Sequence, residues 1–423
     1  MIAKNAKLIQ PNTMVVGVDI AKTTHWAMVM YEGMPVGKAF AIQNTREGFQ
    51  NLLFTLNALK QKLGAHSIVV GMEPTGHYFK PLAYFLANTG MCKVVLVNPY
   101  HVNRSKEFDD NSPTKNDKKD ARVIARLVSQ GNYFFASLSY GAWAELRISN
   151  VDRLQLIKKR WQLKNQLTAI LDQFFPEFTD VFKDILGKGA RHVLTHYPFP
   201  TDILEVEEQT LCNGLKEATS NRVGQKRAQK LRKAALHSIG IKEGLQGARI
   251  QVVHLVEQLG VIQRQIRDVE IMMAEQLEET GLAEYLTSIP GVGVVSAAAF
   301  LSEVGNPDDY ENYKQVQKKA GLNLKENSSG QHKGKTTISK RGRPSLRQLM
   351  YQIALVSVAR NPEMKAFYRY MTTRQENPLA GKQALIAVAV KMIKVMLAVC
   401  KKREYYDGSK VGNGHQEAGL QAA

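Results

Sequence analysis

The chain has 423 residues, and its 57 Lys and Arg against 38 Asp and Glu give a formal net charge of +19. An excess of this size makes a polyanion the expected partner. The three cysteines are scattered and odd in number, which argues against a disulfide framework and indicates a reducing compartment. No signal peptide is evident, and no apolar run reaches the length of a membrane span. We therefore expect a cytoplasmic protein of two or three domains.

The first hundred residues alternate between short apolar runs of strand length and longer repeats of helical spacing. The order of these elements, a meander followed by crossovers, predicts an RNase H-like α/β domain over residues 1–140. The expected elements are strands at 14–18, 26–31 and 36–42, a helix at 45–63, a strand at 67–72, a helix at 78–88 and a strand at 93–98.

Four acidic residues are candidates for a metal site. Asp19 follows the first predicted strand and Glu73 follows the fourth, and in this strand order those two strands are neighbours. The reactive crevice of an open α/β sheet lies at the carboxyl ends of its strands. Asp117 and Asp120 are three residues apart at the start of an apolar helical repeat, so they share one helix face.

Four carboxylates in one crevice repel one another unless cations neutralise them. The sequence therefore predicts two Mg²⁺ ions, the arrangement used for phosphodiester chemistry. For the pair on the helix alone, the alternative is a first turn enriched in Asp because of the helix dipole. The lysines around that pair would then form a solvated face.

Residues 141–281 are predicted to be helical and to contain a heptad run. The apolar residues of that run alternate at spacings of three and four, which predicts a coiled coil and hence a homo-oligomer. An antiparallel hairpin with residues 146–175 of the same chain would give the same pattern. The run consists of Val252, Leu255, Leu259, Ile262, Ile266, Val269 and Met273.

The same region contains a basic insert. Residues 221–233 carry six basic side chains and no acid, which favours a helix that faces phosphates over one that is merely solvated. His192 and His196 are four residues apart, but they lack a third ligand, so we expect no zinc site there.

Residues 282–404 are predicted to form a mostly helical C-terminal domain. The sequence Ile289-Pro-Gly-Val-Gly293 lies between two helical runs and resembles a helix-hairpin-helix turn. Gly291 and Gly293 would let backbone N–H groups approach a DNA phosphate. An ordinary tight turn between helices is the alternative. Residues 405–423 are predicted to be a disordered tail.

A basic loop follows this turn. Residues 314–347 hold ten basic residues and one acid, and the centre of the segment is rich in Gly, Ser and Thr. The sequence Arg341-Gly-Arg-Pro344 resembles an arm that enters the minor groove of DNA. The predicted DNA-binding residues of the segment are Lys333, Lys335, Lys340, Arg341, Arg343 and Arg347.

These motifs together resemble the DEDD-type transposases of bacterial insertion sequences. The matching segments are VGVDIAK around Asp19, MEPTGHY around Glu73, NPYHV from Asn98, KNDKKDARVIARL from Lys115, and then IPGVG, AGLNLKENSSG and KRGRPSLRQLMYQIALVSVARNP. The family is the insertion-sequence family numbered one hundred and ten, whose N-terminal domain is similar to the RuvC Holliday-junction resolvase. Asn116 replaces the threonine of the family's K-T-D-x-x-D-A pattern, and both acids are kept.

The resemblance implies a mechanism and partners that composition does not. It implies that the four acids bind Mg²⁺ and that a C-terminal serine attacks DNA to form a covalent serine–DNA intermediate. Ser329, in the Ser-Gly dipeptide, matches that serine, and its neighbour Ser328 is the alternative. A serine in a polar loop is more often a turn residue, so only the resemblance distinguishes Ser329. Lys333, Lys335, Lys340 and Arg341 would hold the scissile phosphate.

The resemblance also implies a bridge RNA that guides the recombinase to donor and target DNA, and a dimer of dimers with composite sites. Arg222, Lys226, Arg227 and Lys230 of the basic insert are the expected RNA contacts. The competing interpretation is a RuvC-like structure-specific nuclease that uses metal-activated water. A non-catalytic nucleic-acid-binding protein would explain the positive charge but not four acids at strand ends.

Overall fold

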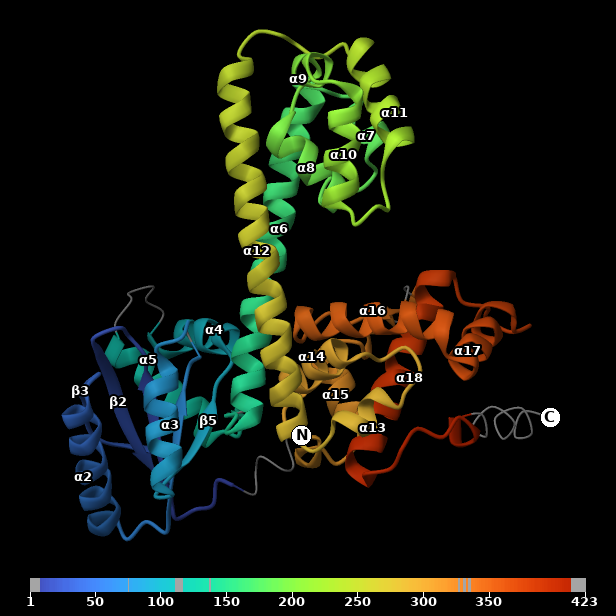
Figure 1. The fold of residues 1–423 in the computed structure, drawn as a ribbon. Helices are drawn as coiled ribbons and strands as arrows, with labels where there is room; N and C mark the ends of the chain where they lie inside the picture. The colour runs from blue at the N-terminus through green and yellow to red at the C-terminus, as the bar shows by residue number, and fades with distance from the viewer. Residues whose placement is uncertain are drawn as a thin grey trace. The chain divides into compact units, whose positions relative to one another are not determined.

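The computed structural model describes residues 8–74, 76–110, 117–136, 138–325, 328–329, 332–333 and 336–411, and only the backbone of residues 106–110, 328–329 and 332–333. The chain divides into two compact units, residues 1–138 and 139–423 (Figure 1). The division falls two residues before the predicted limit of the N-terminal domain at residue 140.

A six-stranded mixed sheet forms the centre of the first unit, with the strand order β3-β2-β1-β4-β5-β6. β1 pairs with β2 antiparallel and with β4 parallel, so the predicted meander and the predicted pairing of the first and fourth strands are confirmed. The two-residue edge strand β6 was not predicted. The strands are β1 (Thr13–Asp19), β2 (Thr24–Tyr31), β3 (Met34–Gln43), β4 (Ser67–Met72), β5 (Lys93–Leu96) and β6 (Phe134–Phe135).

Local signals set the ends of the helices in this unit. The Thr45 hydroxyl accepts a hydrogen bond from the Gly48 N–H (3.1 Å) at the start of α2, and Gly64 ends that helix in the left-handed conformation. Helix α4 is not among the predicted elements, since the sequence analysis places no element between the strand at 93–98 and the helix that carries Asp117 and Asp120. Pro99 is the first residue of α4. The helices are α2 (Arg46–Leu63), α3 (Phe79–Thr89), α4 (Pro99–Asp110) and α5 (Asp117–Ser129).

Two long helices form a stalk in the second unit, α6 (Ala142–Phe174) and α12 (Leu245–Glu279). They run antiparallel, as shown by the ion pair of Arg153 with Glu270 (2.7 Å) and by the hydrogen bond from the Ile241 N–H to the Gln173 carbonyl (3.0 Å). The heptad residues Leu259, Ile266 and Met273 are buried. The heptad run therefore forms the alternative arrangement, a hairpin within one chain.

Five short helices gather at one end of the stalk and form a tip subdomain (Figure 1). Buried side chains of this subdomain, including Phe178 and Phe199, form one apolar cluster with Leu167 of α6 and Leu259 of α12. The helices are α7 (Phe178–Val181), α8 (Lys188–His196), α9 (Pro200–Glu205), α10 (Glu208–Ala218) and α11 (Gln225–Leu236).

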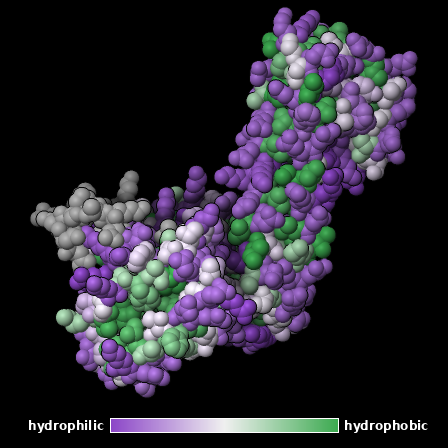
Figure 2. All heavy atoms as spheres, turned by 90° about the vertical axis from the view of Figure 1, so that its left-hand side faces the viewer, coloured by the Kyte–Doolittle hydropathy of each residue, from purple (hydrophilic) through white to green (hydrophobic). Residues whose placement is uncertain are grey.

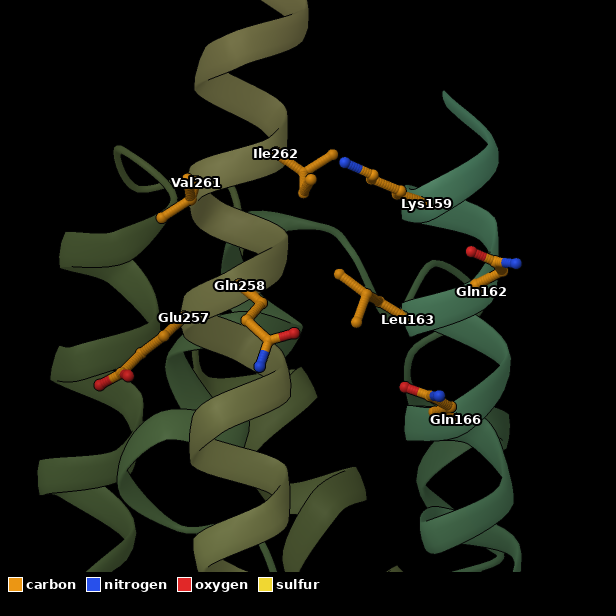
Figure 3. A pocket seen from close by; sticks show the side chains of 8 residues that line it. All are labelled: Lys159, Gln162, Leu163, Gln166, Glu257, Gln258, Val261 and Ile262. Atoms are coloured by element: carbon orange, nitrogen blue, oxygen red, sulfur yellow. The ribbon is translucent and has the colours of Figure 1, made fainter. Parts of the chain in front are cut away.

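A gap lies between the two stalk helices, beyond the apolar cluster and on the side of the C-terminal helices. A cavity of about 650 Å³ separates α6 from α12 there. Figure 3 shows Leu163 of α6 and Gln258 and Ile262 of α12 pointing into the gap. The other lining residues are Lys159, Gln162, Gln166, Glu257 and Val261.

The end of the stalk opposite the tip subdomain packs with residues 282–411 to form the base of the second unit. This base has its own apolar core, which includes Leu146, Met273 and Phe300. Two two-stranded ribbons, β7 (Leu324–Lys325) with β10 (Thr337–Ile338) and β8 (Ser328–Ser329) with β9 (His332–Lys333), lie where a loop was predicted. The helices are α13 (Ala283–Thr287), α14 (Val294–Val304), the 3₁₀ turn η1 (Pro307–Asp309), α15 (Tyr313–Ala320), α16 (Pro344–Arg360), α17 (Pro362–Thr373) and α18 (Gly381–Lys402).

Helix α18 is long and apolar enough to span a membrane by length and composition, although no apolar run of that length was expected from the sequence. Its most apolar window is 61% buried inside the protein, which is typical of the core helix of a domain. The chain after α18 folds back over it. Tyr406 bonds to Ser288 and Asn361, and Val411 is buried, so the prediction of a disordered tail is wrong for residues 405–411. Residues 412–423 lie outside the described residues.

Candidate active site

Asp19 and Glu73 lie side by side at one edge of the sheet. Strand β1 pairs with β4 in parallel register, with Val18 opposite Met72, and each acid is the next residue along its strand. Neighbouring strands are about 4.8 Å apart. The sheet therefore brings together two acids that are 54 positions apart in the sequence, as predicted.

Two glycines show which face of the sheet helix α5 covers. A Cβ atom at Gly17 would collide with the backbone of Ala121 and Ala125, and one at Gly71 would collide with the Val128 side chain. Both glycines therefore face α5. Side chains two positions apart in a strand point to the same face, so Asp19, the last residue of β1, also points toward the face that α5 covers. Glu73 directly follows β4.

The first turn of α5 carries the other two acids. Asp120 is 5% exposed and directly precedes Ala121, the residue that packs on Gly17, whereas Asp117 is exposed. Between them, the Lys118 ammonium lies 4.7 Å from the centre of the Trp26 ring. Trp26 is the partner of Asp19 in the β1–β2 pair. This contact places the first turn of α5 near the end of β1.

Among the described residues, no three Asp, Glu, His or Cys side chains are close enough together to hold a metal ion. The fold brings Asp19 and Glu73 to the ends of neighbouring strands and the first turn of α5 close to the end of β1. The chemistry of these acids nevertheless suits a hard cation, because carboxylate oxygens are the ligands that Mg²⁺ prefers. Asp19, Glu73 and Asp120 would supply ligands from two strands and a helix.

His25 is a residue near this site that the sequence analysis missed. Its side chain is fully buried, and its Nδ1 atom accepts a hydrogen bond from the Ala21 N–H (3.2 Å) in the turn after Asp19. Burial lowers the pKa of His25, so its ring is neutral at pH 7. Asn44 bonds to the Lys22 carbonyl in the same turn (2.9 Å). The turn that follows Asp19 is therefore fixed from two sides.

The candidate nucleophile lies in a ribbon of the second unit. The backbone of Ser329 pairs with His332, and the backbone of Ser328 pairs with Lys333. Lys335 lies outside the described residues, so the predicted phosphate-binding role of that residue stays a prediction. Lys340 and Arg341 follow the ribbons, and both side chains are exposed.

Two of the predicted DNA contacts have partners inside the protein. The Arg343 guanidinium bonds to the Glu303 carbonyl (2.7 Å) and lies 3.5 Å from its carboxylate, which also pairs with Arg147 (2.6 Å). Arg347 bonds to the Ala320 carbonyl (3.0 Å). Sequence reasoning missed these internal roles, because a basic loop gives no sign of the carbonyl groups that it will meet.

The predicted turn between two helices is present at residues 288–293. Gly291 has a φ of +94°, and a Cβ atom there would press on Ser357 of α16, so the turn packs closely on that helix. Gly293 precedes the first residue of α14 and is exposed. The first residue of α14, Val294, is also exposed.

The basic insert forms α11, and part of its charge is used within the tip subdomain. The Arg227 guanidinium bonds to the Val181 carbonyl, and Lys230 bonds to the Asp180 carbonyl (2.8 Å), both at the end of α7. Cations stabilise the C-terminal end of a helix by satisfying its free carbonyl groups. Arg222 and Lys226 are exposed.

Comparisons with known proteins agree with this architecture. Residues 16–176 match the family model of the IS110 DEDD transposase domain, and residues 283–369 match that of the IS116/IS110/IS902 family transposase. A protein of insertion element IS110 from Streptomyces coelicolor is 24% identical over 92% of this chain and 95% of its own. The pilin gene-inverting protein of Moraxella bovis is 23% identical over 93% of this chain and 97% of its own.

The fold, the acids at its strand ends and these matches define a DNA transposase or recombinase. The two family matches together cover more than half of the chain. The chain belongs to the IS110/IS116/IS902 family of insertion-sequence transposases. Membership of a DEDD family implies that the enzyme uses a divalent metal ion.

Proposed function

We propose that the chain is the Mg²⁺-dependent, RNA-guided recombinase of an insertion sequence, with a RuvC-like N-terminal domain. The observation that carries the proposal is the position of Asp19 and Glu73 at the ends of paired parallel strands, with Asp19 on the face covered by α5. Asp120 and Asp117 begin that helix. These four residues would hold two Mg²⁺ ions, which would supply positive charge to neutralise the reacting phosphate.

Ser329 is the proposed nucleophile. Its Oγ atom would attack the scissile phosphorus while the bond from phosphorus to one strand end breaks, and that end would leave as a hydroxyl. A hydroxyl from a second strand would then displace the serine, so that the bond is conserved and the DNA is rejoined. Lys340 and Arg341, which are exposed beside the ribbon, suit the scissile phosphate. The name of the Moraxella relative describes a DNA inversion, which requires rejoining.

A bridge RNA and a homo-oligomer complete the proposal. Arg222 and Lys226, on the exposed side of the tip subdomain, are the RNA contacts best supported by the structure. Gly293 at the start of α14 is positioned for a backbone contact with DNA, in the manner of a helix-hairpin-helix. We place the enzyme on nucleoid DNA in the bacterial cytoplasm, as a dimer or a dimer of dimers.

The metal site is tested by Asp19→Asn, Glu73→Gln, Asp117→Asn and Asp120→Asn. Each change removes one metal ligand and keeps the side-chain size, so each should abolish strand exchange and leave the fold intact. Recombination on plasmid DNA is measured in Mg²⁺, with circular dichroism as the fold control. Recombination at the parent's rate by one of these variants would remove that residue from the site.

The serine is tested by searching for the covalent adduct. Reactions with labelled DNA are run on denaturing gels, where the parent should give a shifted band that protease removes. Ser329→Ala should lose this band and still bind DNA, while Ser328→Ala should keep it. Cleavage by the parent with no such band would favour the alternative, a resolvase-type nuclease that transfers the phosphate to water.

A further inference from the structure

One exposed aromatic residue lies at the edge of the sheet where the acids are found and has no role in the proposed mechanism. Tyr100, the second residue of α4, is 58% exposed. Aromatic rings bury a large area when they are covered and dominate the energetics of interfaces. An exposed tyrosine at the rim of an active site is therefore a candidate for substrate contact.

The backbone places Tyr100 close to Glu73. Strands β4 and β5 are parallel, and the Val97 N–H donates to the Met72 carbonyl (3.0 Å), so Glu73 is level with Val97. Tyr100 is three residues farther along the chain, which is at most about 10 Å of extended backbone. The aromatic ring thus belongs to the same edge of the sheet as the acids.

Tyr100 is also held rigidly. The Asn98 side chain accepts a hydrogen bond from the Tyr100 N–H (3.0 Å), which caps α4, and Pro99 fixes the first helical residue. Val102 of the same turn is fully buried. The Arg104 guanidinium, one turn later, lies 5.1 Å from the centre of the Tyr100 ring. This cation–π contact restrains the ring itself.

We infer that Tyr100, supported by Arg104, is a stacking platform for an unpaired nucleobase beside the carboxylate site. Aromatic rings next to cationic groups bind single-stranded nucleic acid in this way, since every base has a flat face and every nucleotide a phosphate. The inference rests on the proposed function for the nature of the substrate. We infer in addition that one base of the strand at the site is unpaired and stacks at the start of α4.

The test measures stacking rather than catalysis. Oligonucleotides of DNA and of RNA that contain 2-aminopurine are titrated with full-length Asp19→Asn protein, which should bind without cutting. Stacking quenches the fluorescence of this base. Tyr100→Ala should abolish the quenching and weaken binding about tenfold, within the range for one base–aromatic stack. Tyr100→Phe should retain the quenching, because the ring and not the hydroxyl makes the contact.

The matched control is Phe54→Ala, which removes an even more exposed aromatic ring (79% exposed) from the middle of α2. It should leave the quenching unchanged. Loss of quenching with DNA alone would assign the base to DNA, and loss with RNA alone would assign it to the RNA. Quenching by Tyr100→Ala equal to that of its Asp19→Asn parent on both oligonucleotides would overturn the inference, whatever the recombination assay shows for Asp19.

Discussion

At the scale of single residues, Gly17 controls how closely α5 approaches the sheet. The Gly17→Ala change would drive a methyl group into the backbone of Ala121 and Ala125. Overpacking against backbone typically costs about 1–3 kcal/mol, and here it would also push Asp120 away from Asp19. We expect lower thermal stability and loss of strand exchange. Gly260→Ala, at an open position in α12, is the control and should be neutral or stabilising.

Lys319 gives the base of the second unit a dependence on pH. Its ammonium bonds to the Val304 carbonyl (2.9 Å) and the Tyr310 hydroxyl (2.6 Å). Burial, and then the positive charges of Arg343 and Arg147, lower the pKa of Lys319 to about 7, although Glu303 and Asp309 oppose the shift. The unfolded chain keeps a pKa near 10.4. Between these values the unfolded state binds more protons, so stability rises with pH.

The prediction is that the free energy of unfolding of the parent rises from pH 7 to pH 10 because Lys319 loses its proton in the folded state. Urea denaturation at several pH values measures this rise. Lys319→Met cannot titrate, and the difference between parent and variant should grow over the same interval. A constant difference would show that Lys319 keeps its proton in the folded state over this interval, so that its pKa is not lowered.

Residue patterns also explain what the sequence could and could not predict about the site. Asp19 and Glu73 were predictable, because alternating apolar runs define the strands and the acids end them. The buried hydrogen bond of His25 and the internal hydrogen bond of Arg343 were not, because both depend on a carbonyl or an N–H group that only the folded chain brings close. Spacing along one element is visible in a sequence, whereas contacts between elements are visible only when the topology is known.

At the scale of elements, α11 carries basic residues of two kinds: some bond to carbonyl groups inside the protein, and others are exposed to solvent. Arg232 of this helix bonds to the Ile203 and Val206 carbonyls at the end of α9, while Lys226 on the same helix is exposed. Arg232→Met should lower the melting temperature, because it leaves the end of α9 without a cap and its charge. Lys226→Met should leave the melting temperature unchanged and weaken RNA binding. Equal effects of the two changes on RNA binding would contradict this division.

The heptad run is a further case in which the sequence did not reveal a contact between two elements. Its period predicted a helical seam correctly, but a period does not identify the partner helix. The structure identifies α6 as that partner, and Leu259 and Ile266 are buried in the hairpin. Charged residues at these positions would therefore disrupt one subunit, so they cannot test assembly. A test of assembly needs residues on the outside of the stalk.

At the scale of the whole molecule, the surface of the stalk supplies such residues. Figure 2 shows apolar patches among its hydrophilic side chains. Trp161 is 53% exposed and Val261 is 41% exposed, on α6 and α12 respectively. If the stalk associates with a second copy, Trp161→Glu should lower the mass measured by light scattering and leave the melting temperature unchanged. Leu236→Glu, at an exposed position of the tip subdomain (67%), is the matched control.

The tip subdomain has a consequence for the order of folding. The chain leaves the stalk at Gln173 and returns at Ile241, and one hydrogen bond joins these two points. Until the tip folds, α6 and α12 can meet only by closing a long flexible loop, which costs entropy. Once it folds, the two helices start side by side, and their pairing can spread down the stalk toward Arg153 and Glu270. Phe178→Ala in the tip should therefore slow the refolding of the stalk, whereas Leu286→Ala in the base should mainly speed unfolding.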